Sequence, residues 1–416
     1  MRDELIAALA GRAERALELQ SGLTSFPALS PENGGEGEER KAVWLEERLR
    51  AFGLKNIEHV DAPDSRVPSG RRPNMIVRVP GRTRRMLWVL AHLDVVPPGE
   101  LSLWKSDPWT VTRDPADPDL IYGRGVEDNQ QAAVSAILLA AELKEKGITP
   151  ELGLGIILVA DEETGNKYGI EHVLAERPDL IAPDDLVMVP DYGTVDGALI
   201  EVAEKSTLWV KVTVTGAQCH ASTPDEGKNA LVAASDMILH VQSEMEARFP
   251  ERNSLFTPDR STITPTRHDA NVPNVNTMPG KDVFFVDSRI LPHYDLDEVL
   301  AAMRAFMEGV AARHGVGVEL EVVNREAGPA PTPVDSPVVV ALKDAVFKVY
   351  GIRCREGGVG GGTVAKQFRA RGINAAVWCR VLDNCHVPNE GARLSHAVGD
   401  AQVYAHMLFA SDSGMV

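Results

Sequence analysis

The sequence predicts an α/β fold, a sandwich built on a mostly parallel sheet into which a smaller α+β domain is inserted. Two observations lead to this prediction. Apolar strand-like runs alternate with helix-like segments in the first half of the chain, and the pattern changes near residue 207 to strands of alternating polarity. The chain of 416 residues is also too long for one ordinary core, so two domains are expected.

The first half of the chain supplies the elements of the sandwich. Residues 39–52 repeat apolar side chains at helical spacing, and Gly53 follows as a C-cap. The strand-like runs are almost wholly apolar, which is typical of strands buried on both faces of a parallel sheet. We expect strands at 74–79, 86–91, 152–160 and 186–189 and an Ala- and Leu-rich helix at 126–146.

A second pattern begins near residue 207. Residues 208–215 alternate apolar and polar side chains, as a half-exposed antiparallel strand does. We expect further strands at 283–290 and 316–323 and helices at 229–247 and 295–314. Two helices among antiparallel strands indicate a small α+β domain.

The proline-rich stretch 329–333 is the expected return linker. A helix at 336–350 and an apolar strand at 375–379 then resume the α/β pattern. The expected larger domain therefore consists of residues 1–205 and 326–416, and residues 206–325 form the inserted domain.

The composition narrows the class of protein. Apolar residues make up 44% of the chain and charged residues 25%, which is typical of a soluble globular protein. The net charge of −17 argues against a nucleic-acid partner, because phosphate binding needs a positive surface. No run of about 18 apolar residues occurs, so we expect no membrane span. Charges interrupt the N-terminal Ala/Leu run, which therefore indicates an amphipathic helix and not a signal peptide, and we expect a cytoplasmic protein.

The cysteines indicate neither a zinc ribbon nor a redox pair, since none of them forms a C-x-x-C motif. They are Cys219, Cys354, Cys379 and Cys385. Whether any two of them form a disulfide is left open by the sequence.

Polar side chains follow the ends of several predicted strands. His92 and Asp94 come directly after the strand 86–91, and ligand sites in open α/β sheets lie beyond the carboxyl ends of strands. His92 is a candidate metal ligand, and Asp94 is a candidate hydrogen-bond partner for its other ring nitrogen. Taken alone, the pair is equally compatible with a polar loop of no function.

Asp128 lies at the entrance to the predicted helix 126–146. Gly123 and Gly125 precede it and allow a tight turn, and a carboxylate is favourable at a helix N-terminus. The simple alternative is a capping acid. The two glycines do not form a dinucleotide-binding fingerprint, because no third glycine follows at the required spacing.

Asp161, Glu162 and Glu163 directly follow the strand 152–160. Three adjacent acids at the end of a buried strand repel one another unless cations or protons intervene. Asp191 follows the strand 186–189, and His386 follows the strand 375–379.

Strand ends of this kind meet at one edge of the sheet, so we expect these acids and imidazoles to lie together. Such ligands suit zinc or a similar divalent ion. Two divalent ions would balance three carboxylates and a bridging hydroxide, and one spare acid, Glu162 or Glu163, would remain as a general base.

These motifs occur together in the order that characterises one family. They are Ala91-His92-Leu93-Asp94-Val95-Val96-Pro97, Gly123-Arg124-Gly125-Val126-Glu127-Asp128, Asp161-Glu162-Glu163-Thr164-Gly165, Asp191, Gly216 through His220-Ala221-Ser222, and His386-Val387-Pro388-Asn389-Glu390. The chain resembles the M20 family of metallopeptidases and amidohydrolases, which includes glutamate carboxypeptidase, peptidase T, aminoacylase and succinyl-diaminopimelate desuccinylase.

The resemblance implies a role for each of these residues. Asp128 would bridge two metal ions, with His92 and Asp191 completing one site. Glu163 and His386 would complete the other site. Asp94 would orient His92, and Glu162 would be the general base that takes a proton from a water held between the ions. The expected ions are zinc, with cobalt and manganese as alternatives.

The resemblance also assigns residues to the substrate. His220, in the inserted lid or dimerisation domain, would donate to the oxyanion, either across a homodimer interface or within its own subunit. Asn276 and Arg289 match positions that hold substrate. Gly361, Gly362 and Thr363 match a backbone element near the substrate carboxylate, although a simple flexible turn is an equal alternative.

The expected substrate is a small peptide or an N-acyl amino acid. Asp at position 191 resembles the peptidase members more than the deacylases. Desuccinylation of succinyl-diaminopimelate and deacylation of an acetylornithine type stay open as alternatives. A catalytically inactive, ligand-binding homologue is a third alternative, against which the intact Glu162 and the complete ligand set argue.

Overall fold

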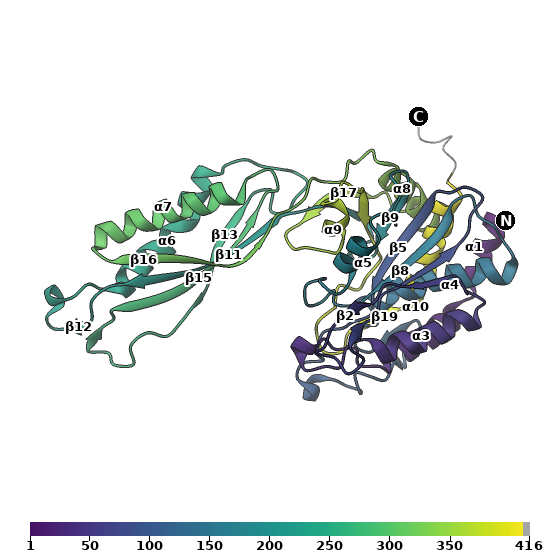
Figure 1. Ribbon diagram of the computed structural model, residues 1–416, viewed down its shortest axis with the longest axis horizontal. Coiled ribbons are helices and arrows are strands. Elements are labelled where there is room, and N and C mark those ends of the chain that lie inside the picture. Colours follow the sequence, from purple (N-terminus) through teal and green to yellow (C-terminus); the bar gives the residue numbers. More distant parts are fainter. Residues whose placement is uncertain (411–416) are drawn as a thin grey trace. The chain divides into compact units, whose positions relative to one another are not determined.

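The computed structural model of the chain describes residues 1–410, which divide into two compact units (Figure 1). The larger unit contains Met1–Val202, Thr332–Glu356 and the described residues from Thr363 onward. The smaller unit contains Ala203–Pro331 and Gly357–Gly362. The expected boundaries put residues 357–362 in the larger domain. The structure groups them with the smaller unit because the Lys205 N–H donates to the Val359 carbonyl at 3.1 Å.

The sheet of the larger unit contains eight of the described strands, in the order β1-β4-β8-β5-β9-β18-β10-β17. Its central strands β8, β5, β9 and β18 run parallel, whereas β1, β4 and β10 pair antiparallel at its margins. The strands are Ile57–His59 (β1), Met75–Val79 (β4), Gly153–Val159 (β8), Met86–His92 (β5), Leu186–Val189 (β9), Ala375–Val377 (β18), Leu199–Glu204 (β10) and Arg355–Val359 (β17).

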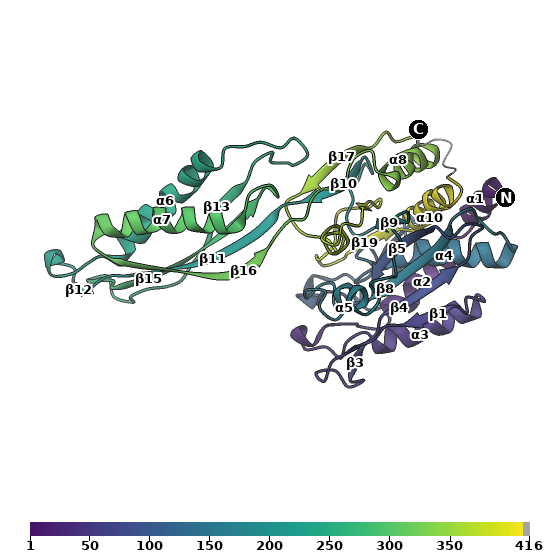
Figure 2. The same cartoon turned by 45° about the horizontal axis from the view of Figure 1, so that its top comes forward.

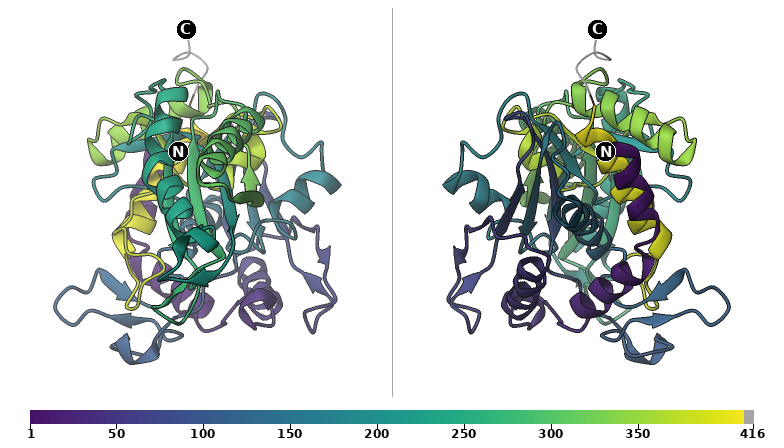
Figure 3. Two further views of the ribbon diagram at one scale, coloured as in Figure 1. Left: turned by 90° about the vertical axis from the view of Figure 1, so that its left-hand side faces the viewer. Right: turned by 90° about the vertical axis from the view of Figure 1, so that its right-hand side faces the viewer.

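Helices cover both faces of this sheet (Figure 3). Trp88 and Leu90 of β5 point to one face, where they pack with Val173 of helix α5 and Phe368 of helix α9. Helix α4 packs against β5 and β8, and α10 packs against α4. The helices are Arg2–Ala10 (α1), Ala13–Thr24 (α2), Glu39–Ala51 (α3), Gln130–Lys146 (α4), Ile170–Glu176 (α5), Pro337–Tyr350 (α8), Ala365–Arg369 (α9) and Leu394–Leu408 (α10). The predicted α/β fold with its mostly parallel sheet is confirmed.

One predicted helix starts later than expected. The segment 126–146 was expected to be helical throughout, but α4 begins at Gln130. The preceding turn has its own hydrogen bonds, since the Glu390 carboxylate accepts from the N–H groups of Glu127 and Asp128.

The smaller unit is a four-stranded antiparallel sheet with two helices along one side (Figure 2). The strand order is Thr262–His268 (β13), Lys281–Ile290 (β15), Ser206–Thr215 (β11) and Gly317–Glu326 (β16). The helices are Ala230–Arg248 (α6) and Leu296–His314 (α7), and their N-caps Asn229 and Asp295 accept backbone N–H groups. Strand β13 was not predicted from the sequence, because it contains Pro265, after which its register with β15 is irregular.

The remaining strands form small pairings. They are Ala62–Pro63 (β2) with Arg71–Arg72 (β3), Gly391–Arg393 (β19) with Leu120–Tyr122 (β7) and Thr112–Arg113 (β6), and Cys219–His220 (β12) with Thr277–Met278 (β14). Short 3₁₀ helices occur at Pro31–Asn33, Leu101–Leu103 and Pro224–Glu226. Among the described residues, none of the helices combines the length and apolarity that a membrane crossing requires.

Candidate metal centre

His92 is the last residue of β5 and its side chain is fully buried. Its Nε2 lies 2.9 Å from Oδ1 of Asp128. Its Nδ1 lies 3.0 Å from the carbonyl oxygen of Asp94 and 3.4 Å from the Asp94 carboxylate. The nearer partner of this ring nitrogen is therefore the backbone carbonyl of Asp94 and not the carboxylate that the sequence suggested.

The Asp128 carboxylate lies between two imidazoles. His92 approaches Oδ1, and Nε2 of His386 lies 2.9 Å from Oδ2. Each imidazole has a second carboxylate beside it: Asp191 Oδ1 is 3.5 Å from His92, and Glu163 Oε1 is 3.1 Å from His386. The structure thus brings together all five residues that the sequence named as ligands, in two groups that share Asp128.

Asp94 positions the acidic loop after β8. One carboxylate oxygen accepts from the backbone N–H of Glu162 at 3.1 Å, and the other accepts from that of Glu163 at 3.0 Å. Asp161, the first acid of the loop, adopts the left-handed backbone region with φ 63°. Its carboxylate accepts from the Tyr168 N–H at 2.9 Å.

Glu162 is the acid of this loop whose carboxylate stays free. Within residues 1–410 its side-chain oxygens have no hydrogen-bond partner, and its backbone N–H is the group held by Asp94. Burial and the neighbouring charge of Asp191 hold the pKa of Glu162 well above its ordinary value. A carboxylate without competing hydrogen-bond donors is suited to accepting and releasing a proton.

The carboxylates attract positive charge to the site. Burial would lower the pKa of His92, but the adjacent carboxylates of Asp128 and Asp191 outweigh it and hold that pKa well above its ordinary value. Hydrogen bonds to Asp128 and Glu163 raise the pKa of His386 to about 10. Burial raises the pKa of Glu163 to about 7, although the bond from His386 opposes the rise.

This arrangement fits divalent metal ions. His92, Asp128 and Glu163 each offer a ligand atom, and these atoms all lie within 4.8 Å of one another. Imidazole nitrogens and carboxylate oxygens are the donors that zinc and similar ions prefer. The excess of carboxylates over cationic groups would be balanced by such ions.

Asn129 was missed by the sequence analysis. Its side-chain Nδ2 donates to the Pro190 carbonyl and to Asp191 Oδ1, both at 2.9 Å, and its Oδ1 accepts from the His92 N–H at 3.3 Å. Asn129 therefore ties the end of β5 to the end of β9. Its position directly after Asp128 was the only signal available, since none of these three bonds is local in sequence.

In the smaller unit, the antiparallel pairing of β12 with β14 holds His220 beside Asn276. The Ala221 N–H donates to the Asn276 carbonyl at 2.9 Å. Nδ1 of His220 accepts from the Ser222 N–H at 3.2 Å. An acceptor Nδ1 places the proton of the neutral imidazole on Nε2, which leaves Nε2 as a hydrogen-bond donor.

Arg289, also in the smaller unit, already has a carboxylate partner. Asp287 accepts from its Nε at 2.8 Å and from its Nη2 at 3.1 Å. Its Nη1 donates to the carbonyl of Gly360 at 3.0 Å, next to Gly361 and Gly362. The guanidinium thus supports the glycine segment that the sequence placed near the substrate.

Thr363 belongs to the larger unit and lies two residues before α9. Its Oγ1 accepts from the Ala365 N–H at 3.2 Å. This contact accounts for a hydroxyl residue at position 363 without a substrate.

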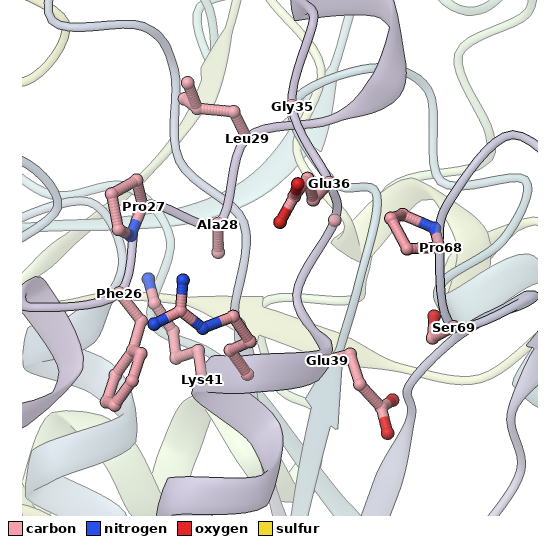
Figure 4. Close-up of a pocket in the computed structure, with 12 residues that line it drawn as sticks. Phe26, Pro27, Ala28, Leu29, Gly35, Glu36, Glu39, Lys41, Pro68 and Ser69 are labelled. Carbon is pink, nitrogen blue, oxygen red and sulfur yellow. The ribbon is translucent and has the colours of Figure 1, made fainter.

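A separate cavity of about 530 Å³ lies beside α3 in the larger unit (Figure 4). Phe26, Pro27, Leu29 and Pro68 give it mostly apolar walls. Lys41 also lines it and donates from Nζ to the Leu93 carbonyl at 2.8 Å. None of the candidate site residues lines this cavity, so it is distinct from the metal centre.

A buried imidazole, His92, and a half-exposed one, His386, lie with their carboxylates at the carboxyl edge of a mostly parallel sheet, and a second domain is inserted in the chain. This arrangement fits a metal-dependent hydrolase. The chain belongs to peptidase family M20/M25/M40, whose profile matches residues 88–410. The resemblance inferred from the motifs is therefore confirmed, and the chain is an enzyme of the metallopeptidase and amidohydrolase type.

Two relatives and one solved structure illustrate this kinship. An uncharacterized metallohydrolase of Methanocaldococcus jannaschii is 34% identical over 95% of this chain and 99% of its own. A succinyl-diaminopimelate desuccinylase of Stenotrophomonas maltophilia is 28% identical over 70% of this chain and 74% of its own. The aminopeptidase PepT of Bacillus cereus has the same fold, with a TM-score of 0.73, 19% identity, and coverage of 95% of this chain and 98% of its own.

Proposed function

We propose that the protein hydrolyses an amide bond in a small peptide or an N-acyl amino acid with the help of two divalent metal ions. The observation that carries this proposal is the Asp128 carboxylate, which has one imidazole on each oxygen, His92 at 2.9 Å and His386 at 2.9 Å. A carboxylate placed in this way is suited to bridging two ions. Zinc is the proposed ion, and cobalt and manganese are the alternatives.

The remaining ligands divide between the two ions. Asp191 would join His92 in holding one ion, and Glu163 would join His386 in holding the other. The short distances within each pair, 3.5 Å and 3.1 Å, support this division. When bound, the ions would supply Lewis acidity, which polarises a carbonyl group and lowers the pKa of water.

The chain's own residues would move the protons. Glu162 would take a proton from the attacking water and release it to the leaving amine nitrogen, and its free carboxylate and raised pKa support this role. Nε2 of His220 would donate to the carbonyl oxygen as negative charge develops there, a contact typically worth about 3 kcal/mol. We propose that this histidine serves the neighbouring subunit of a homodimer formed through the smaller unit.

Two substrate classes compete. A peptidase activity is supported by Asp191, an aspartate at the position where the peptidase members of the family carry one, and by the fold shared with the aminopeptidase PepT. Desuccinylation or deacetylation of an amino acid is supported by the similarity to succinyl-diaminopimelate desuccinylases. In either class, Asn276, Arg289 and the glycines 361 and 362 would hold the substrate. We place the enzyme in the cytoplasm, where small peptides and amino-acid precursors are processed.

A substrate panel tests the proposal. The chelator-treated protein is reloaded with zinc, cobalt or manganese and assayed on dipeptides, N-acetyl amino acids and N-succinyl amino acids. We expect chelation to abolish hydrolysis and metal to restore it on at least one class. The Glu162→Ala variant serves as the matched inactive control. A metal-loaded protein that cleaves none of these amides above the level of this control would refute the proposal.

A further inference from the structure

Two loops meet at the metal centre and hold each other through a pair of buried carboxylates. The aspartate turn, residues 123–129, precedes α4 and carries Asp128. The histidine loop, residues 382–391, follows β18 and carries His386. Each loop supplies one glutamate to the other: Glu390 of the histidine loop reaches the aspartate turn, and Glu127 of the aspartate turn reaches the histidine loop.

Glu390 accepts hydrogen bonds from several backbone N–H groups of the aspartate turn. One of its oxygens accepts from the N–H groups of Glu127 at 2.9 Å and Asp128 at 3.1 Å. The other accepts from the Gly125 N–H at 2.9 Å and from Arg124 Nη1 at 2.7 Å. Glu390 is fully buried, and Arg124 balances its charge. The backbone that presents Asp128 therefore depends on this one carboxylate.

Glu127 performs the corresponding task for the histidine loop. Its two oxygens accept from the N–H groups of Leu382 at 2.5 Å and Asn384 at 2.9 Å. Asp383 and His386 adopt positive φ angles of 62° and 61°, which non-glycine residues seldom adopt without support from their surroundings. The loop has no strand or helix of its own between residues 382 and 390, so side-chain acceptors such as Glu127 must hold its backbone.

We infer that Glu127 and Glu390 are positioning residues that form a reciprocal clamp, and that the two glutamates control different metal sites. The inference rests on the proposed two-ion site. The Glu127 carboxylate supports the loop of His386, so its loss should weaken the binding of one ion. Glu390 supports Asp128, which both ions would share, so its loss should weaken both.

Glutamine substitutions test this division. In Glu127→Gln and Glu390→Gln the side chain keeps its size, but its NH₂ group faces backbone N–H donors and cannot accept from them. Glu142→Gln is the matched control. Glu142 is also fully buried and lies on α4, at the end far from the site, where it pairs with Arg15 at 3.2 Å.

The measurement is zinc stoichiometry and affinity of the full-length protein, by elemental analysis and by competition with a chromophoric chelator. Thermal unfolding of the metal-free proteins is recorded in parallel. We expect Glu127→Gln to keep one tight zinc and to bind the second about 10- to 100-fold more weakly. Glu390→Gln should weaken both zinc ions. Glu142→Gln should bind both as the wild type does, even where its melting temperature falls.

Three results would overturn the inference. If Glu127→Gln binds both zinc ions with the affinity of the wild type, the histidine loop does not need Glu127. Loss of the second zinc in Glu142→Gln as well would show that general destabilisation is the cause. A wild-type protein that binds only one zinc would refute both the clamp and the two-ion site. A wild-type protein that binds two zinc ions but cleaves no amide refutes only the proposed function, and the comparison of the variants still decides the clamp.

Discussion

The Asp94 carboxylate accepts the backbone N–H of Glu163 at 3.0 Å, and this bond joins the end of β5 to the acidic loop after β8. Its other oxygen accepts the N–H of Glu162 at 3.1 Å. Asp94 therefore orients the proposed base and a proposed metal ligand through their backbone, while its carbonyl oxygen faces His92. One residue links both ligand groups of the centre.

Replacing the Asp94 side chain should disturb the acidic loop more than the His92 imidazole, whose nearer partner is the backbone carbonyl of Asp94. We expect Asp94→Ala to lower zinc affinity or kcat/KM by about 10- to 100-fold, because the N–H groups of Glu162 and Glu163 both lose their acceptor. Asp94→Asn retains one acceptor oxygen, so its zinc affinity and kcat/KM should lie between those of Asp94→Ala and those of the wild type. Zinc titration and steady-state kinetics at saturating zinc measure both effects. An Asp94→Ala protein with wild-type values would mean that the loop holds its shape unaided.

The adjacent acids Glu162 and Glu163 should respond differently to substitution. Glu162→Ala should lower kcat by about 10²- to 10⁴-fold with unchanged metal content, since a general base would be lost. Glu163→Ala should reduce metal occupancy, because its carboxylate lies 3.1 Å from His386 in the ligand set. Elemental analysis alongside kinetics separates the two outcomes. If Glu162→Ala loses metal and Glu163→Ala keeps it, Glu163 is the base and Glu162 is the ligand.

Asn129 should matter for stability as well as for metal binding. Asn129→Ala removes the donor to Asp191 Oδ1 and to the buried Pro190 carbonyl. We expect a loss of about 1–3 kcal/mol in the free energy of unfolding, measured by urea denaturation of the metal-free protein. Zinc affinity should fall as well, because Asp191 loses its orientation. A variant that unfolds at the wild-type urea concentration would contradict this account.

Asp400 should make the stability of the larger unit depend on pH. Burial raises the pKa of Asp400 to about 7, from 3.8, although Tyr350 and Gln131 donate to its oxygens. The folded chain therefore binds a proton that the unfolded chain releases, so stability falls as pH rises from about 4 to about 7 and levels off above that.

Asp400→Asn removes this titration. Relative to the wild type, the variant should gain up to about 4 kcal/mol as pH rises through this window, since one pKa unit corresponds to about 1.4 kcal/mol. Urea denaturation of both proteins at pH 5, 6, 7 and 8 measures the difference. If the free energies of unfolding of the two proteins change in parallel across this pH range, Asp400 is not the group that titrates.

Subunit mixing tests whether His220 acts on the neighbouring subunit. Inactive Glu162→Ala subunits are mixed with inactive His220→Ala subunits under conditions of demonstrated exchange. If His220 acts in trans, one site of each mixed dimer combines an intact Glu162 with an intact His220, and activity returns to about a quarter of the wild-type value with random pairing. Absence of recovery would assign His220 to its own subunit.

The amino-acid sequence alone predicted the class of fold and a candidate ligand set. Alternation of apolar runs with helical periodicity is a local property, and it predicted β5, β8, β9 and the parallel sheet. Parallel strands end at one edge, so the residues that follow them, such as His92 and Asp191, had to converge whatever the details of packing.

The tertiary structure alone decided how these residues are held. Asn129, Glu127 and Glu390 bond to backbone groups that lie far from them in sequence, and no periodicity marks such partners. The turn that precedes α4 has the same origin, because Glu390 holds its backbone N–H groups from a distant part of the chain. Whether a carboxylate serves as a ligand, a base or a clamp depends on which donors the folded chain brings within hydrogen-bonding distance, and only the packing of the loops determines that.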